Sequence, residues 1–308
     1  MPSYLTRINQ LILEHAARLP DAIHMGENID KGSCICGIAK GLGEAAARAP
    51  GARVVNVGNC ENTHVGLGFG VMLNGGNTIL YVKQLDFLAL AADPLINTLN
   101  LVRGVGGGGF TIVAIVCDQG FQGPQSSWNG LSALCSLTRA AGYAISDAAQ
   151  AEAVFLGQFG RPGFRIVALS QRLFGEPAGT EAPVEVAPGP AVVRFGQGSG
   201  ATIACFGFTL PQGFALRDRL AAQGGTAAMF AVHDVPAGGW NPAVHHAAQS
   251  GRLYLLDDGK GAVSPAHKLA HMVLAAAPGC RVSAFTREED APAQVCADRF
   301  EPNFSLVA

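Results

Sequence analysis

Apolar residues recur along the first half of the chain with two different periods. Leu5, Ile8 and Leu11 lie three residues apart, on one face of a helix. This spacing predicts an amphipathic helix over residues 4–18. Further helices are predicted over residues 35–48, 93–103 and 148–159. Short apolar runs typical of strands cover residues 22–25, 53–57, 78–82, 110–117 and 164–169.

The alternation of helices and strands returns in the second half of the chain. Strands are predicted over residues 201–206, 226–231, 252–256 and 281–285. Helices are predicted over residues 211–222, 241–250 and 264–276. Strands that alternate with helices of this length indicate parallel sheets covered by helices. We therefore expect an α/β protein with two doubly wound domains.

A proline-rich segment separates the two halves. Residues 176–190 contain four prolines and little apolar periodicity, which is typical of a linker. The length of 308 residues also agrees with about two domains. We predict a first domain over residues 1–175 and a second over residues 191–308, joined by this linker.

Composition excludes several classes of protein. Charged residues make up 14% of the chain, against about 25% in ordinary soluble domains, and the net charge is −2. A disordered chain would be more charged, and a nucleic-acid binder would have an excess of Lys and Arg. No apolar run approaches the roughly 20 residues that a membrane span needs. We expect a cytoplasmic protein that binds neither nucleic acid nor membrane and covers part of its weakly charged surface with partners.

The most informative segment begins where the predicted strand 53–57 ends. A Gly-Asn-Cys turn leads to Glu61, and a predicted helix with the small residues Gly66, Gly68 and Gly70 follows. Because α/β folds bind ligands at the carboxyl ends of their strands, Glu61 is a candidate proton donor or hydrogen-bond partner in an apolar setting. The alternative is a residue that caps a helix N-terminus. Position alone favours the cap.

Other short motifs accompany Glu61 in order along the chain. Gly26-Glu27 follows the first strand, Phe87 precedes Asp93-Pro-Leu-Ile-Asn97, and Gly123-Pro124 opens a later loop. Together with Glu61 in NCENTHVGLGFGVMLNGG, they make the chain resemble the pyrimidine-binding domain of thiamine diphosphate enzymes. The resemblance is to the β subunit of 2-oxo acid dehydrogenase E1 components and to the carboxyl half of transketolases. It covers nearly the whole chain and implies that residues 191–308 are a transketolase-type carboxyl-terminal domain.

The resemblance implies roles for these residues. In the family the glutamate binds N1′ of the cofactor pyrimidine and favours the 4′-imino form, whose nitrogen removes the thiazolium proton; Glu61 has this place. Phe87 corresponds to the aromatic that stacks on the pyrimidine, although without the resemblance it is better interpreted as a core aromatic. Glu27 either positions groups near Glu61 or caps a turn. The implied reaction transfers a two-carbon ketol or acyl unit from a ketose or a 2-oxo acid.

The chain departs from the family pattern at two positions. The family's Gly-Pro loop carries a histidine close behind the proline, where this chain has Ser126. A hydroxyl does not exchange protons near pH 7 as an imidazole does, so we expect proton transfer to use Ser126, water or another histidine such as His64. Leu85 replaces the first of the family's paired aromatics, so the resemblance implies that Leu85 lies with Phe87 at the cofactor. These departures leave a dehydrogenase subunit, a split transketolase and a carboligase open.

A further departure is the absence of a motif. Family members bind the diphosphate through Mg²⁺ with a Gly-Asp-Gly motif and a later Asn, and no Gly-Asp-Gly occurs here. The Mg²⁺ still needs oxygen ligands, so the resemblance implies that another chain supplies them and that this chain holds no metal. We expect a homodimer of this chain with α-type chains, a heterotetramer active only as a complex. The alternative is a non-catalytic structural or regulatory subunit that keeps the fold, although the retained Glu61 argues against it.

Overall fold

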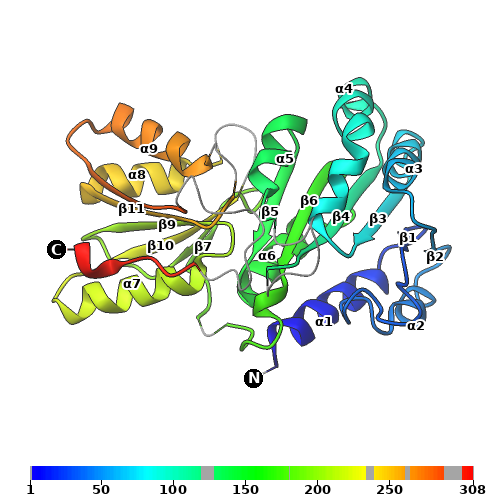
Figure 1. The fold of residues 1–308 in the computed structure, drawn as a ribbon, viewed down its shortest axis with the longest axis horizontal. Helices are drawn as coiled ribbons and strands as arrows, with labels where there is room; N and C mark the ends of the chain where they lie inside the picture. Colours follow the sequence, from blue (N-terminus) through cyan, green and yellow to red (C-terminus); the bar gives the residue numbers. More distant parts are fainter. Residues whose placement is uncertain are drawn as a thin grey trace.

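The computed structural model describes residues 2–118, 128–179, 181–233, 239–260, 264–287 and 300–307. These residues form two six-stranded sheets, each covered by helices (Figure 1). Every neighbouring pair in the first sheet is parallel, and so are most pairs in the second. The predicted α/β class with two wound sheets is therefore confirmed.

The first sheet has the strand order β2-β1-β3-β4-β6-β5. Its strands are β1 (Ile23–Gly26), β2 (Arg53–Asn56), β3 (Asn77–Val82), β4 (Gly109–Val116), β5 (Ala141–Ile145) and β6 (Gly163–Ser170). The α-helices around it are α1 (Tyr4–Ala16), α2 (Leu42–Ala46), α3 (Glu61–Leu73), α4 (Leu99–Val102), α5 (Leu131–Thr138) and α6 (Ala148–Gln158). Shorter turns of helix are η1 (Leu85–Ala91), the π-helical η2 (Pro94–Thr98) and η3 (Gln171–Leu173). Strand β4 is buried at every position, as expected for the centre of a sheet covered on both faces.

The second sheet has the strand order β12-β11-β9-β10-β8-β7. Its strands are β7 (Glu185–Val186), β8 (Val192–Phe195), β9 (Thr202–Phe206), β10 (Ala228–Val232), β11 (Arg252–Asp257) and β12 (Arg281–Phe285). Its helices are α7 (Leu210–Ala222), α8 (Asn241–Ser250), α9 (Pro265–Ala276) and the short η4 (Phe304–Leu306). Strand β8 pairs antiparallel with both β10 and β7. Strand β7 lies within residues 176–190, so part of this segment joins the sheet.

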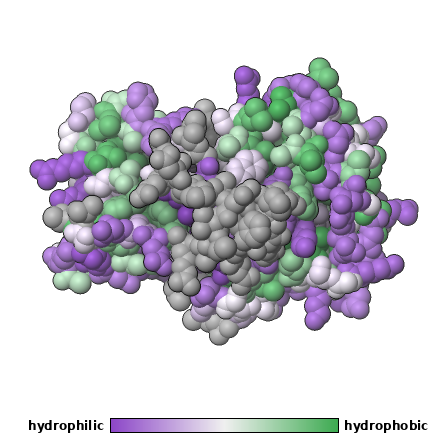
Figure 2. Space-filling model, in the orientation of Figure 1, coloured by the Kyte–Doolittle hydropathy of each residue, from purple (hydrophilic) through white to green (hydrophobic). Residues whose placement is uncertain are grey.

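The helices lie on both faces of the sheets. In Figure 1, α3, α4 and α5 lie on one face of the first sheet and α1, α2 and α6 on the other. Apolar residues also reach the surface near the top of this domain, where α4 and α5 lie (Figure 2). Leu101 of α4 is 81% exposed and Leu137 of α5 is 58% exposed. In the described part of the chain no single helix is long and apolar enough to cross a membrane; η1 with η2–α4 meets that test only as a pair bent by 79°.

The prediction of a helix over residues 35–48 is wrong for most of its length. Helix α2 begins only at Leu42. Cys34, Ile35 and Cys36 have positive φ angles of 46°, 49° and 52°. L-residues adopt this left-handed conformation at a cost, and three in succession cannot start a right-handed helix. The apolar spacing identified a buried surface, because Ile35 and Ile38 are buried, but it did not fix the hand of the turn.

Helix α5 and strands β5 and β8 were not predicted. The apolar pattern that would predict β5 is weak because the strand contains Gly142. Packing against α5 explains why a glycine stands there. A Cβ atom at Gly142 would lie 2.3 Å from Sγ of Cys135 on α5, so the helix approaches the strand closely. Glycine in a strand weakens the apolar pattern while it allows such an approach.

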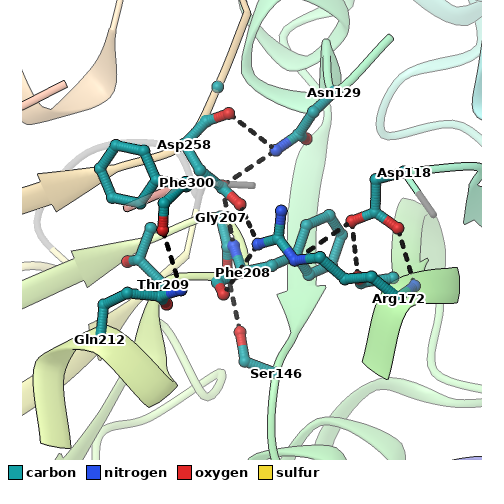
Figure 3. Close-up of polar contacts among 12 residues, drawn as sticks. Asp118, Asn129, Ser146, Arg172, Gly207, Phe208, Thr209, Gln212, Asp258 and Phe300 are labelled. Carbon is teal, nitrogen blue, oxygen red and sulfur yellow. Dashed lines mark hydrogen bonds and ion pairs between the residues drawn. The ribbon is translucent and has the colours of Figure 1, made fainter. Parts of the chain in front are cut away.

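A buried polar network joins the two domains (Figure 3). The carboxyl groups of Asp118 and Asp258 belong to residues only 1% and 0% exposed. The guanidinium of Arg172 forms ion pairs with both, and the Arg172 backbone N–H donates to Asp118 Oδ1 at 2.9 Å. Asn129 and the backbone N–H of Phe208 also donate to Asp258 Oδ1, at 2.9 and 3.0 Å. Because buried carboxylates need such partners, the network requires the two domains to dock in this arrangement.

Helix α3 approaches the first sheet closely at Gly68. A Cβ atom at Gly68 would lie 2.3 Å from Cζ of Phe110 on β4, whereas one at Gly66 would meet nothing within 4 Å. The Phe110 ring also packs against Phe69 and Phe164, with centroids 5.1 and 5.2 Å away. The aromatic cluster therefore occupies the place of a side chain at position 68.

We expect Gly68→Ala to lower the free energy of unfolding by about 1–3 kcal/mol, because the helix or the Phe110 ring must move. The matched variant Gly66→Ala should leave it unchanged or raise it by up to about 1 kcal/mol, since alanine favours a helix. Urea denaturation of both variants measures the difference. Equal stabilities would contradict the close approach at Gly68.

Candidate functional site

Glu61 is the first residue of α3 and follows the carboxyl end of β2. It is only 7% exposed. A carboxylate in the first turn of a helix is stabilised by the helix dipole, which agrees with a capping role. A cap does not need burial, however. The burial of Glu61 is thus the observation that capping alone leaves unexplained.

A small cavity brings together most of the site residues predicted from the sequence. Glu27, Glu61, His64 and Phe87 line it. The remaining lining residues are Gly26, Leu80, Tyr81, Val82 and Lys83. The cavity lies at the carboxyl edge of the first sheet, because β1, β2 and β3 are parallel and all end there. Its volume of about 20 Å³ has room for about one water molecule.

Burial changes the proton affinities of two groups in this cavity. It raises the pKa of Glu27, and the nearby charge of Glu61 raises it further, while Lys83 opposes the shift. Burial also lowers the pKa of His64, and Glu61 partly offsets this shift. Glu27 therefore holds its proton more tightly than an ordinary glutamate, and His64 is neutral at pH 7. Such shifted groups next to a buried carboxylate are suited to proton exchange.

The other residues predicted from the sequence do not line this cavity or lie outside the described residues. Leu85 is fully buried in η1 and does not line the cavity, whereas Phe87, two residues on, is half-buried and does. The Asp-x-x-x-Asn motif forms one turn, in which Asn97 Nδ2 donates to Asp93 Oδ1 at 2.7 Å. Ser126 and the Gly-Pro loop lie outside the described residues, so the role of Ser126 stays a prediction.

The sequence patterns did not single out a buried carboxyl group beside Phe87. Asp86 is 8% exposed, and its Oδ2 atom has no hydrogen-bond partner within the described structure. Burial raises the pKa of Asp86 to about 6, although the backbone N–H of Trp128 and the charge of Lys260 oppose the shift. The available signal was an aspartate in the otherwise apolar run LDFLALA.

A histidine and a tyrosine lie behind the cavity. His24 of β1 is fully buried, and its Nδ1 atom lies 3.1 Å from the hydroxyl oxygen of Tyr81 on β3. Burial lowers the pKa of His24 to about 4, so the imidazole stays neutral at pH 7. Tyr81 also lines the cavity, so this pair supports one of its walls. Among the described residues, no group of three or more His, Cys, Asp and Glu side chains could hold a metal ion.

Comparisons with known proteins give three results. No family model matches the chain. Over 112 residues, 36% of its length, the chain is 29% identical to the pyruvate dehydrogenase E1 component subunits beta-3 and beta-2, chloroplastic, of Arabidopsis thaliana. The match spans only 27% of the length of each relative. The fold is similar to that of a split gene transketolase in an inactive β4 tetramer, with a TM-score of 0.72 and 17% identity over 93% of this chain and 90% of that one.

The pH dependence of stability tests the burial of Asp86. Its pKa is raised from about 3.8 to about 6 on folding, so the folded chain binds the proton more tightly. The stability from this group is full below about pH 4 and is lost as the pH rises through about 6. Burial also raises the pKa of Asp118 and of Asp147 to about 6, so the comparison is between variant and wild type.

We expect Asp86→Asn to reduce the fall in unfolding free energy between pH 4 and 7 by about 1–3 kcal/mol, because asparagine cannot ionise. The control is Asp218→Asn, whose side chain is 76% exposed and should leave the profile unchanged. Urea denaturation at a series of pH values measures both. A wild-type profile for Asp86→Asn would show that this carboxyl group is solvated.

Proposed function

We propose that this chain, which has the fold of the transketolase-like pyrimidine-binding β chains, is the β-type subunit of a two-chain thiamine diphosphate enzyme. The proposed reaction transfers a two-carbon ketol or acyl unit from a ketose or a 2-oxo acid, and the proposed location is the cytoplasm. The observation that carries the proposal is the burial of Glu61 in one cavity with Glu27, His64 and Phe87.

The side chains that line this cavity fit an aminopyrimidine ring. A buried carboxyl can share a proton with a ring nitrogen, and the half-buried ring of Phe87 offers an aromatic surface. The cavity itself, at about 20 Å³, does not hold a ring. The remaining walls of the proposed cofactor site would therefore come from outside this cavity, which favours a site completed by a second chain.

Each residue has a distinct proposed task. Bound thiamine diphosphate would supply a carbon nucleophile for a carbonyl substrate. Glu61 would hold a proton at its carboxyl oxygen in a site with little water. Glu27, whose pKa is raised, would position groups near Glu61, and neutral His64 would accept a proton. Phe87 would orient the ring, and Ser126 remains a candidate for weak proton transfer.

The proposed assembly combines two copies of this chain with α-type chains that carry the diphosphate-binding domain and the Mg²⁺ ligands. The similar solved structure is described as a β4 tetramer, which supports self-association. On α3, Leu67 and Leu73 are 54% and 38% exposed. Gly66 and Gly70 of the same helix have open space where a Cβ would be. This apolar face with little side-chain bulk allows another chain to approach closely.

Substitution of Glu61 tests the proposal. In the complex with the α-type partner, thiamine diphosphate and Mg²⁺, we expect Glu61→Gln to lower kcat by about 100-fold or more, because it cannot hold the transferred proton. The matched control is Glu44→Gln, since Glu44 also lies in the first turn of a helix but is exposed.

Glu44→Gln should keep wild-type kcat. Wild-type kcat in Glu61→Gln would refute the proposed role of Glu61. An inactive wild-type complex that binds no thiamine diphosphate would instead favour the alternative, a non-catalytic subunit that keeps the fold.

A further inference from the structure

Lys83 is the cationic residue of the Glu61 cavity, the small cavity that Glu61 lines with Glu27, His64 and Phe87. It follows directly on the last residue of β3, at the carboxyl edge of the first sheet. No other lysine or arginine is among the described residues that line this cavity. The proposed roles of Glu61, Glu27 and His64 leave this ammonium group without a task.

The ammonium group of Lys83 is available to a ligand. Lys83 is exposed, whereas Glu61 in the same cavity wall is buried. Lys83 forms no ion pair with the described residues. A cation with a structural role is paired, as Arg172 is in the interdomain network. An ammonium group without such a partner is suited to an anionic group that a ligand brings.

The charge of Lys83 acts on groups that follow two different strands. Burial raises the pKa of Glu27, which follows β1, and the charge of Lys83 opposes this shift. Burial also raises the pKa of Cys117, which follows β4, to about 12, and Lys83 again opposes the shift. The Cys117 Sγ atom donates to the backbone carbonyl oxygen of Lys83 at 3.7 Å. The cation therefore acts at the carboxyl ends of the strands, where α/β folds bind ligands.

The place of this cation distinguishes between the two classes of donor that the proposed function leaves open. In a 2-oxo acid the carboxylate is bonded directly to the carbonyl carbon that reacts. In a ketose the neighbours of that carbon are uncharged, and the phosphate of a ketose phosphate lies several bonds away from it. Lys83 lines the same cavity of about 20 Å³ as Glu61 and Phe87. A cation this close to the proposed ring site fits a carboxylate on the reacting carbon.

We propose that Lys83 binds the carboxylate of a 2-oxo acid donor. This inference rests on the proposed function and narrows it, because an uncharged ketose offers the ammonium group no anionic partner. The other titratable groups of the wall are Glu27, Glu61 and the neutral side chains of His64 and Tyr81. None of these carries a positive charge, so Lys83 is the residue of this wall that attracts an anion and thereby selects the donor class.

Calorimetric titration at pH 7 tests this proposal on the complex with the α-type partner, thiamine diphosphate and Mg²⁺. Two unreactive probes are compared: oxamate, which has the shape and charge of a small 2-oxo acid, and ethyl oxamate, its uncharged ester. We expect oxamate to bind at least about tenfold more tightly than ethyl oxamate. Equal binding of the two probes, or no oxamate binding up to about 10 mM, would overturn the proposal. Tighter binding of inorganic phosphate than of oxamate would indicate a phosphate site and would also overturn it.

Variants of Lys83 locate the contact. Lys83→Met keeps the length of the side chain without its charge and should weaken oxamate binding by about tenfold or more, with ethyl oxamate binding unchanged. Lys83→Arg keeps the charge and should bind oxamate within about threefold of wild type. The matched control Lys40→Met removes an exposed lysine that does not line the cavity and should bind oxamate as wild type does. Wild-type oxamate binding in Lys83→Met would refute the contact.

The affinity for thiamine diphosphate separates this inference from the proposed function. We expect the Lys83→Met complex to bind thiamine diphosphate as wild type does. A wild-type complex that binds the cofactor but does not prefer oxamate would refute the role of Lys83 alone. A wild-type complex that binds no cofactor would overturn both proposals. Loss of assembly in Lys83→Met would place Lys83 at the interface between the chains and would refute its role in donor binding.

Discussion

The close approach of α3 to the first sheet determines the geometry of the candidate site. The ring of Phe110 occupies the space beside Gly68 where a side chain would be, so the helix lies close to β4. Glu61 stands about two turns of helix before Gly68, at the N-terminus of α3. It therefore reaches the carboxyl edge of the sheet, where the turn after β1 supplies Glu27 and the end of β3 and η1 supply further parts of the wall.

The buried carboxyl groups of this chain differ in their partners. Asp118 and Asp258 share the guanidinium of Arg172 and hold the two domains together. Glu61, which lines the small cavity, and Asp86, which precedes Phe87 in sequence, form no ion pair among the described residues. Paired carboxylates stabilise a specific arrangement, whereas buried ones without an ion pair are candidates for proton exchange.

The sequence predicted those features that follow from local pattern and sheet geometry. Parallel strands end at one edge, so motifs after separate strands, such as Glu27 and Glu61, meet there. The same reasoning did not exclude Leu85, because the apolar spacing of η1 does not show that Leu85 points into the core and Phe87 toward the cavity. The left-handed turn at Cys34–Cys36 also escaped prediction, since periodicity carries no information on the sign of φ.

Long-range polar contacts left no local signal. Asp118 and Asp258 are 140 residues apart in sequence, and only the docking of the domains brings Asp258 to Arg172, which Asp118 contacts within the first domain. A cavity that both domains line depends on the same docking. Such features follow from tertiary structure, and neither the composition nor the spacing of residues predicts them.

The central claim is that the Glu61 cavity is an incomplete cofactor site that a second chain completes. Titration calorimetry with thiamine diphosphate and Mg²⁺ tests it most directly, on this chain alone, on an α-type partner alone and on their mixture. The account predicts that the mixture binds the cofactor at least about tenfold more tightly than either chain alone. Equally tight binding by this chain alone, or no binding by the mixture, would contradict it.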